Sequence, residues 1–354
     1  MTTKRRIAVL FGGRSPEHDV SVVTGLQALA AVDASAYDAF PVYISTDGDW
    51  FVGEPLRDRA NYLPDDYTRR ALTEVMLDSS GDGDGRLVPK KSGLFGRGTA
   101  TEFDAALLAF HGNQGEDGQI QGLFEMADIP YTGMRTLASA AFMDKSVTKR
   151  LLAGHDIPQL DCAVLRRPAE GVMMSGTALA EAVGNAKFPA CVKPCHLGSS
   201  IGVAKVDDMD ELREVLPSIF RLDPLAIMEP FVPNLVEYNV AVATFDGAIR
   251  TSAIERPKRS AELLDFREKY MSGGGGKKGG GKAPGAVSEG MLSLTRDINP
   301  ELPADLEANI RNWAGEAFAF GEWRNRKCPV LRGFGAIIEE LEESQLNLQT
   351  WHFF

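Results

Sequence analysis

The feature that most constrains the fold is a short apolar run near the start of the chain that stops at two glycines. Ile7–Phe11 contain no polar residue, and Gly12-Gly13 follow directly. An uninterrupted apolar run of this length is typical of a parallel strand covered on both faces. A helix is expected from about Val20 and a second strand at Phe40–Ile44. This strand–helix–strand order predicts an α/β layer with a parallel sheet.

The rest of the chain continues to alternate between apolar runs and loops. Residues 78–101 are rich in Gly, Asp, Ser and Lys and are expected to form a loop. A hairpin is expected from Phe188–Pro194 and Gly202–Val206, which a Gly/Ser loop separates. The other expected elements are strands at Phe103–Phe110, Leu160–Leu165, Leu225–Phe231, Val240–Thr244 and Ala248–Ile254, and helices through Met143–Leu152 and at about 209–218.

Length and charge limit the classes of protein that the chain can belong to. Its 354 residues suit two or three domains. A formal net charge of −11 argues against a broad nucleic-acid-binding face. No apolar run approaches the roughly 18–20 residues of a membrane span, and the run after the basic N-terminus is shorter than a signal-peptide core. The sequence therefore predicts a cytoplasmic protein without nucleic-acid or membrane partners.

Cysteines and histidines give no sign of a metal site. The four cysteines form no CxxC pair, and the five histidines show no HExxH or similar spacing. Cys191 and Cys195 are expected to be a small buried residue and a loop residue. Neither a zinc site nor a disulfide is predicted.

The segment Gly12–Ser21 is the first candidate site. Glycines at a strand end expose backbone N–H groups at a helix start, which is an anion site. Alternatively, Glu17 could hold a substrate ammonium, or the segment could be a plain turn with a helix N-cap at Ser15 or Asp19. The absence of GxGxxG argues against a dinucleotide fingerprint.

Two further segments combine polar side chains with glycines. His111–Gly118 follows the third expected strand, where open α/β sheets bind ligands, although an elaborate loop would look the same. Lys193 ends an apolar strand, and the loop Leu197–Gly202 follows it. Together with Lys145, this loop is suited to clamping nucleotide phosphates. Gly276–Ala283 nearly fits the phosphate loop G-x-x-x-x-G-K-[ST], but it lacks the hydroxyl and follows no strand.

Read together and in this order, these segments resemble D-alanine–D-alanine ligases of the ATP-grasp superfamily. The similarity extends from roughly Ile7 to Ser272. The stretches that carry it are FGGRSPEHDVS (11–21), FHGNQGEDGQIQG (110–122), IPYTG (129–133), MDKSVTKRLL (143–152), VKPCHLGSSIGV (192–203) and DFREKYMS (265–272).

The resemblance implies an α/β fold in which an N-terminal parallel-sheet substrate domain precedes two ATP-grasp domains. The expected bounds are 1–138, 139–235 and 236–354, and the third domain carries a Gly/Lys-rich insertion at 272–285, expected to be mobile. The implied reaction uses ATP to phosphorylate the carboxylate of one D-alanine. The amine of a second D-alanine then displaces phosphate, and the resulting dipeptide is a peptidoglycan precursor.

The resemblance also implies a role for each matching residue. Glu17 would hold the first ammonium in a network with Ser199 and Tyr270, and His111 would lie near the second substrate. Lys145 and Lys193 would bind the α- and β-phosphates, with Ser200 also at the ATP. Lys269 would approach the transferred phosphoryl group. Glu229 and Glu237 would hold adenine and ribose, and the family expectation includes Mg²⁺ or Mn²⁺ and a homodimer.

The segment from about residue 321 departs from the family pattern. The family ends with Arg-x-Asp and Glu-x-Asn strands whose acidic oxygens hold Mg²⁺, and here the nearest match is Gln345-x-Asn347, with Arg332 where the aspartate would stand. An amide and a cation cannot replace two carboxylates around Mg²⁺. The metal ligands therefore stay unassigned. Two alternatives to the active ligase remain: a non-catalytic homologue that binds nucleotide and D-alanine, and a ligase for another carboxylate–amine pair.

Overall fold

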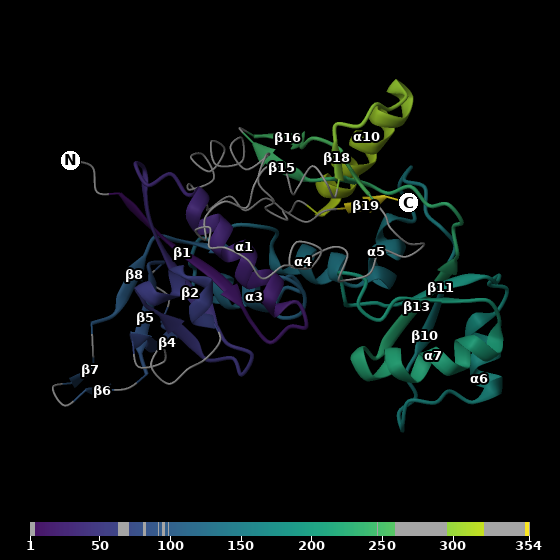
Figure 1. Cartoon of the computed structure of the whole chain (residues 1–354), viewed down its shortest axis with the longest axis horizontal. Helices are drawn as coiled ribbons and strands as arrows, with labels where there is room; N and C mark the ends of the chain where they lie inside the picture. Colours follow the sequence, from purple (N-terminus) through teal and green to yellow (C-terminus); the bar gives the residue numbers. More distant parts are fainter. Residues whose placement is uncertain are drawn as a thin grey trace, which may run out of the picture. The chain divides into compact units, whose positions relative to one another are not determined.

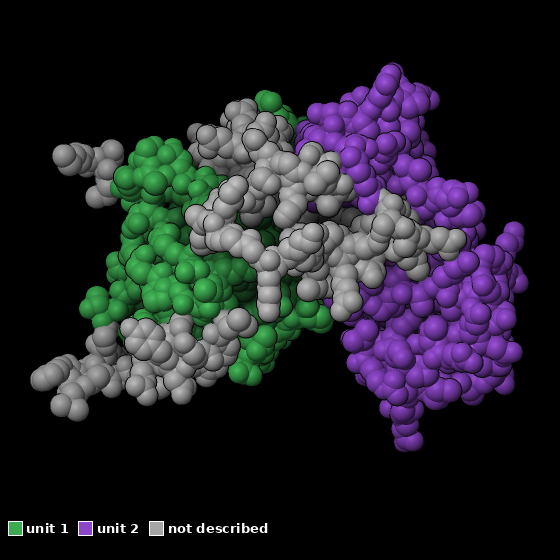
Figure 2. All heavy atoms as spheres, in the orientation of Figure 1, with its two compact units in different colours: residues 1–142, 243–250, 318–348 green, residues 143–242, 251–317, 349–354 purple. Residues whose placement is uncertain are grey.

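The computed structural model describes residues 4–62, 71–80, 83–90, 92–93, 96–97, 99–245, 247–258, 296–321 and 351–353. The described residues divide into two compact units (Figures 1 and 2). Unit 1 falls within 1–142, 243–250 and 318–348, and unit 2 within 143–242, 251–317 and 349–354. The three domain boundaries drawn from the sequence stay a prediction.

Unit 1 is built on a seven-stranded sheet in the order β8-β5-β4-β3-β2-β1-β9. Strand β1 pairs in parallel with β2 and β9, and the remaining neighbours pair antiparallel. The strands are β1 (Arg5–Gly12), β2 (Tyr37–Ile44), β3 (Trp50–Val52), β4 (Thr73–Leu77), β5 (Gly85–Pro89), β8 (Thr101–Phe103) and β9 (Ala105–Leu108). The helical segments are α1 (His18–Ala31), η1 (Glu54–Arg57), η2 (Arg59–Tyr62), α3 (Gln119–Met126) and α4 (Thr136–Met143), and β6 (Ser92–Gly93) pairs with β7 (Gly96–Arg97).

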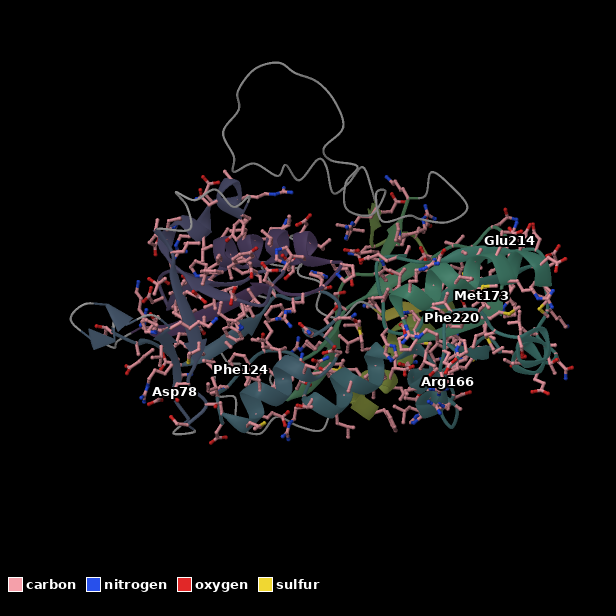
Figure 3. All side chains as sticks on the ribbon, turned by 90° about the horizontal axis from the view of Figure 1, so that it is seen from below. Asp78, Phe124, Arg166, Met173, Glu214 and Phe220 are labelled. Atoms are coloured by element: carbon pink, nitrogen blue, oxygen red, sulfur yellow. The ribbon has the colours of Figure 1, made fainter. Side chains whose placement is uncertain are left out.

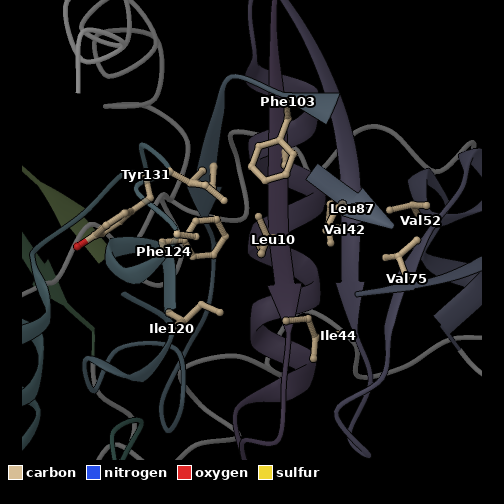
Figure 4. Packing of buried hydrophobic residues seen from close by; sticks show 14 of the residues in the cluster. Leu10, Val42, Ile44, Val52, Val75, Leu87, Phe103, Ile120, Phe124 and Tyr131 are labelled. Carbon is tan, nitrogen blue, oxygen red and sulfur yellow. The ribbon is translucent and has the colours of Figure 1, made fainter. Parts of the chain in front are cut away.

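Strand β1 is buried on both faces, as its apolar run predicts. Val9 and Phe11 pack into a cluster that contains buried side chains of α1. Ala8 and Leu10 alternate onto the other face, in the cluster of Phe124 from α3 (Figure 4). This two-sided cover explains why no polar residue is tolerated between Ile7 and Phe11.

Two expectations for unit 1 were wrong in detail. The expected loop 78–101 contains β5, which pairs with β4 and β8 and buries Leu87. The strand was missed because its few apolar residues are surrounded by turn-forming residues. The single strand expected at 103–110 is two strands. At the break, Asp104 Oδ2 accepts a 2.6 Å hydrogen bond from the backbone N–H of Arg6. Strand β8 therefore pairs with β5, whereas β9 pairs with β1.

Unit 2 contains a four-stranded antiparallel sheet in the order β10-β13-β11-β12. Its strands are β10 (Ala163–Arg166), β11 (Ala190–Pro194), β12 (Ala204–Val206) and β13 (Leu225–Pro230), and its helices are α5 (Lys145–Leu152), α6 (Gly176–Val183) and α7 (Met209–Leu222). The predicted hairpin is confirmed as β11 and β12. Phe220 of α7, labelled in Figure 3, is fully buried in the core that α6 and α7 form with the sheet.

A second four-stranded sheet in unit 2 has the order β18-β17-β14-β19. Its strands are β14 (Tyr238–Val240), β17 (Glu255–Pro257), β18 (Arg296–Ile298) and β19 (Trp351–Phe353), and most of α10 (Ala304–Gly321) belongs to the same unit. The two-stranded sheet of β15 (Val242–Phe245) and β16 (Ala248–Thr251) falls largely within the 243–250 segment of unit 1. Arg311 of α10 donates to Thr251 Oγ1 and Ser252 O, both at 2.8 Å. None of the described helices is long and apolar enough to cross a membrane.

Candidate active site

The carboxyl ends of β1 and β9 are joined through one serine of α1. The backbone N–H of Gly12 donates to Ser21 Oγ, and Ser21 Oγ donates to the carbonyl of Ala109, both at 2.8 Å. Gly13 N–H donates to Ile44 O at the end of β2. Three parallel strands thus end around one turn, which is where open α/β sheets bind ligands.

Glu17 is the residue immediately before α1, and it is 3% exposed. The N-cap at Ser15 or Asp19, one of the alternatives for this segment, was wrong, because the helix begins at His18 and Asp19 lies in its first turn. Ser15 Oγ instead accepts from the N–H of Glu17 at 3.1 Å. The serine therefore orders the turn, and Glu17 is placed at the N-terminal, positive end of the α1 dipole.

The second polar segment lies against the first. A Cβ added to Gly112, whose φ is +74°, would come within 2.5 Å of both Glu17 Oε2 and Ser15 Oγ. His111 is buried, and its Nε2 lies 2.8 Å from Thr24 Oγ1 on α1. Burial lowers the pKa of His111 to about 4, so its imidazole is neutral near pH 7. The structure thus brings Glu17 close to Gly112 and the adjacent His111. The order of these residues in the sequence could not establish this proximity.

Glu116, which was not singled out from the sequence, is part of the same group. Its Oε2 accepts a 2.6 Å hydrogen bond from the N–H of Gly112. The pKa of Glu116 is raised to about 7, mainly by burial; the hydrogen bond from the Gly112 N–H opposes the rise, and the nearby carboxyl groups of Glu17 and Asp117 add to it. Two carboxyl groups in one partly buried site attract a cationic group, which is the charge of an amino-acid ammonium.

In unit 2, a single carboxylate joins two lysines from different elements. Glu229 Oε2 lies 2.5 Å from Lys193 Nζ, and Glu229 Oε1 lies 2.6 Å from Lys149 Nζ. Burial of Glu229 opposes its ionisation, but the charges of Lys193 and Lys149 outweigh it and lower the pKa of the carboxyl group. The two residues assigned from the sequence to phosphate and adenine are therefore direct neighbours. Lys149 was missed; its spacing of one helical turn from Lys145 was the available signal.

Lys145 lies at the first position of α5 and contacts the Gly/Ser loop. Its Nζ donates to Leu197 O at 2.5 Å and to Cys195 O at 3.3 Å, and its backbone N–H donates to Cys195 O. A lysine at a helix N-terminus opposes the helix dipole, so this position has a cost that carbonyl contacts offset. The same combination of a cation and a positive helix end favours a bound anion.

The Gly/Ser loop between β11 and β12 has a strained backbone. Ser199 and Ser200 have φ values of +52° and +59°, a region that non-glycine residues seldom adopt. The loop closes on itself through Ile201 N–H to Gly198 O and Val203 N–H to Ser200 O. Consecutive turns of this type are typical of backbone concavities that bind anions.

The remaining candidates lie partly outside the described residues. Glu237 is buried and directly precedes β14. Lys269, Tyr270, the insertion at 272–285 and the segment 322–350, where the family metal motif would stand, fall outside the described ranges. Within the described ranges, no group of three or more His, Cys, Asp or Glu side chains could hold a metal ion. Cys162, Cys191 and Cys195 are free thiols; Cys195, which follows β11, is buried, whereas Cys191 within β11 is only partly buried.

Solved structures with the same fold define the class of protein. The D-Ala:D-Ser ligase VanG from Enterococcus faecalis superposes with a TM-score of 0.68 at 24% identity, covering 90% of this chain and 83% of that one. The D-alanine–D-alanine ligase from Helicobacter pylori gives a TM-score of 0.63 at 27% identity, covering 89% and 83%. The fold and the lysine-lined loop therefore define an ATP-dependent ligase of the ATP-grasp class.

Sequence comparisons then give the family. The model for the D-ala D-ala ligase N-terminus matches residues 6–134, and the model for the C-terminus matches residues 151–281. The D-alanine–D-alanine ligase of Thermosipho africanus is 33% identical over 307 residues, which are 86% of this chain and 80% of that protein. That of Macrococcus caseolyticus is 33% identical over 303 residues, 84% and 78% of the two chains. The chain belongs to the D-alanine–D-alanine ligase family.

Proposed function

We propose that this protein uses ATP to join two molecules of D-alanine into D-alanyl-D-alanine, a precursor of peptidoglycan. The observation that carries the proposal is that two lysines are positioned at the Gly/Ser loop of unit 2, one through its side chain and one through its strand. Lys193 lies in β11, which leads into the loop, and Lys145 Nζ donates to the loop carbonyl of Leu197. Family membership supports the choice of substrates.

The proposed reaction has two steps. A carboxylate oxygen of the first D-alanine attacks the γ-phosphorus of ATP, the bond to the β-phosphate oxygen breaks, and ADP leaves. The amine of the second D-alanine then attacks the acyl phosphate, phosphate departs with the bonding electron pair, and the amine loses a proton as the amide forms. Both steps need positioning and charge neutralisation more than covalent help from the protein.

The nucleotide roles are assigned to residues of unit 2. Lys145 and Lys193 neutralise the α- and β-phosphates, and Ser200 lies at the ATP in the strained loop. Glu229 accepts from adenine while Lys149 keeps it ionised, and Glu237 accepts from the ribose. The approach of Lys269 to the transferred phosphoryl group stays a prediction.

The substrate roles are assigned to the end of the sheet in unit 1. Glu17 binds the ammonium of the first D-alanine, and the neutral imidazole of His111 faces the second substrate without adding charge. The parts of Ser199 and Tyr270 in the Glu17 network stay predictions, as do a homodimer and a cytoplasmic location. ATP is expected to bind with Mg²⁺ or Mn²⁺, which would neutralise the phosphates, and no described residue is assigned as a ligand of the ion.

Phosphate release separates the active ligase from the alternatives. Purified protein with ATP, Mg²⁺ and D-alanine should release phosphate and form the dipeptide in equal amounts. ATP binding without phosphate release would favour the non-catalytic homologue, which lacks the metal carboxylates. Release that depends on D-lactate or another D-amino acid, and not on D-alanine alone, would favour a different carboxylate–amine pair.

Replacing Glu17 with glutamine should raise the D-alanine concentration needed for half-maximal phosphate release by about tenfold or more, because a neutral amide loses a charge-assisted hydrogen bond to the ammonium. ATP affinity, measured by calorimetry, should stay unchanged. Glu54→Gln is the matched control, since Glu54 is an exposed carboxylate of the same unit that pairs with Arg57. Loss of ATP binding in Glu17→Gln would contradict the assignment of Glu17 to the D-alanine ammonium.

A further inference from the structure

His196, at the start of the Gly/Ser loop, lies between two aspartates from other segments. Its Nδ1 is 2.9 Å from Asp223 Oδ1, and its Nε2 is 3.1 Å from Asp144 Oδ2. Its backbone N–H also donates to Asp223 Oδ2 at 2.6 Å. One side chain and its own amide thus connect the loop to both segments.

Both partners of the ring are buried carboxylates, which can only accept hydrogen bonds when ionised. A neutral imidazole has one N–H, so one of its nitrogens would face a carboxylate with a lone pair. The imidazolium has two N–H groups and satisfies Asp144 and Asp223 at once. The geometry therefore fits the charged ring better than either neutral tautomer.

The two aspartates anchor elements that carry nucleotide-site residues. Asp144 is the N-cap of α5, where its side chain accepts from the N–H groups of Ser146 and Val147. Lys145 is the next residue. Asp223 ends α7 and also accepts from the N–H of Leu225 at the start of β13, the strand that carries Glu229. The imidazole thus connects α5, the loop and the α7–β13 junction.

We propose that the charged side chain of His196 is a positioning residue that holds the Gly/Ser loop and Lys145 in the arrangement that receives ATP phosphates. The inference rests on the proposed function, because it assumes that the loop is the phosphate site. It adds a residue that makes no contact with the nucleotide and acts through Asp144 and Asp223.

The charges around the ring favour protonation. The carboxylates of Asp223 and Asp144 face the ring. The nearest cation in sequence to Asp144 is Lys145, whose ammonium group donates to the carbonyls of Cys195 and Leu197. The hydrogen bond to Asp223 raises the pKa of His196 above its ordinary 6.5, burial opposes the rise, and the charges of Asp223 and Asp144 add to it. Although burial opposes ionisation of both aspartates, hydrogen bonds such as those from His196 and Ser146 hold their pKa values low.

The sign of the effect follows from these directions. Because the pKa of His196 is raised by folding, its stabilisation is fully present below pH 6.5 and is lost as pH rises through the folded value. The aspartates work in the opposite direction, and their contribution is lost only as pH falls below their ordinary 3.8. The loop should therefore be best ordered between these limits.

The test measures ATP affinity by calorimetry from about pH 6 to about pH 9, the range in which a raised histidine pKa is crossed. As pH rises, the ATP affinity of the unaltered protein, divided by that of His196→Asn at the same pH, should fall by about tenfold, because the unaltered protein loses a charge-assisted hydrogen bond. ATP itself titrates in this range, so the ratio of the two proteins at each pH is the quantity to compare. His155→Asn is the matched control, because the ring of His155 pairs with Glu316 of α10, whereas that of His196 pairs with Asp144 and Asp223.

A second variant distinguishes positioning from mere structural support. Asp144→Asn keeps a residue that caps helices well but removes one of the two charges that raise the pKa of His196. The pH at which ATP affinity falls should therefore move downward, and the His196 resonances in NMR titration should move with it. An affinity ratio independent of pH, or an unchanged midpoint in Asp144→Asn, would overturn the inference. Failure of the unaltered protein to bind ATP at any pH would instead overturn the proposed function.

Discussion

Replacing Lys193 with alanine should weaken ATP binding by about tenfold or more, because water competes little with the phosphate for a partly buried lysine, so their charge-assisted hydrogen bond is strong. The structure adds a second reason. Lys193 is also a partner of Glu229, so its removal changes the charge on both the phosphate and the adenine sides of the site. Calorimetry with ATP measures the effect directly.

The control for this variant is Lys187→Ala, which removes an exposed lysine from the same unit. Its ATP affinity should match that of the unaltered protein. Lys149→Ala offers a comparison, since it leaves Lys193 in place but takes the other cation from Glu229. Unchanged nucleotide affinity in Lys193→Ala, with the protein still folded, would count heavily against the assignment of this site.

The second large effect is on stability and concerns Gly12. Its φ is +92°, and an added Cβ would lie 2.2 Å from the carbonyl oxygen of Ile44, the acceptor for Gly13 N–H. Gly12→Ala must therefore displace the end of β1 from β2. We expect the free energy of unfolding to fall by about 3 kcal/mol or more, from left-handed strain and from overpacking together. Urea denaturation gives the difference.

Gly133→Ala separates these two causes. Gly133 has a φ of +101°, but no heavy atom lies within 4 Å of the Cβ that would be added. This variant should lose only the strain, about 1–2 kcal/mol. If Gly12→Ala were no more destabilising than Gly133→Ala, the close packing of β1 against Ile44 would be wrong.

Local sequence patterns predicted the elements whose burial is regular. β1 has an unbroken apolar run because both faces are covered, and the β11–β12 hairpin is marked by a Gly/Ser loop between two apolar segments. Strand β5 was missed because only a few of its residues are apolar and glycine and aspartate surround it. The break at Asp104 depends on a hydrogen bond from Arg6, which no local pattern records.

The candidate site shows the same division. Motif order placed Glu17, His111 and Lys193 near strand ends, and in the structure Glu17 and His111 follow β1 and β9 while Lys193 is the penultimate residue of β11. The direct pairing of Lys193 with Glu229, the part of Lys149 and the contacts of His196 all join residues distant in sequence or assigned separately. Such pairs depend on which strands become neighbours, and spacing along one chain does not carry that information. Lys269 and Tyr270 lie outside the described residues, so their roles remain predictions.

The shared carboxylate of Glu229 has a consequence for how ionic strength acts on this protein. Two lysines around one glutamate leave a net single positive charge, so this group of three side chains projects a weaker field into solvent than two unpaired lysines would. Long-range attraction of a polyanion is what added salt screens most effectively. Association with ATP should therefore slow only modestly as salt is added, and recognition should depend on contacts made after the nucleotide has arrived.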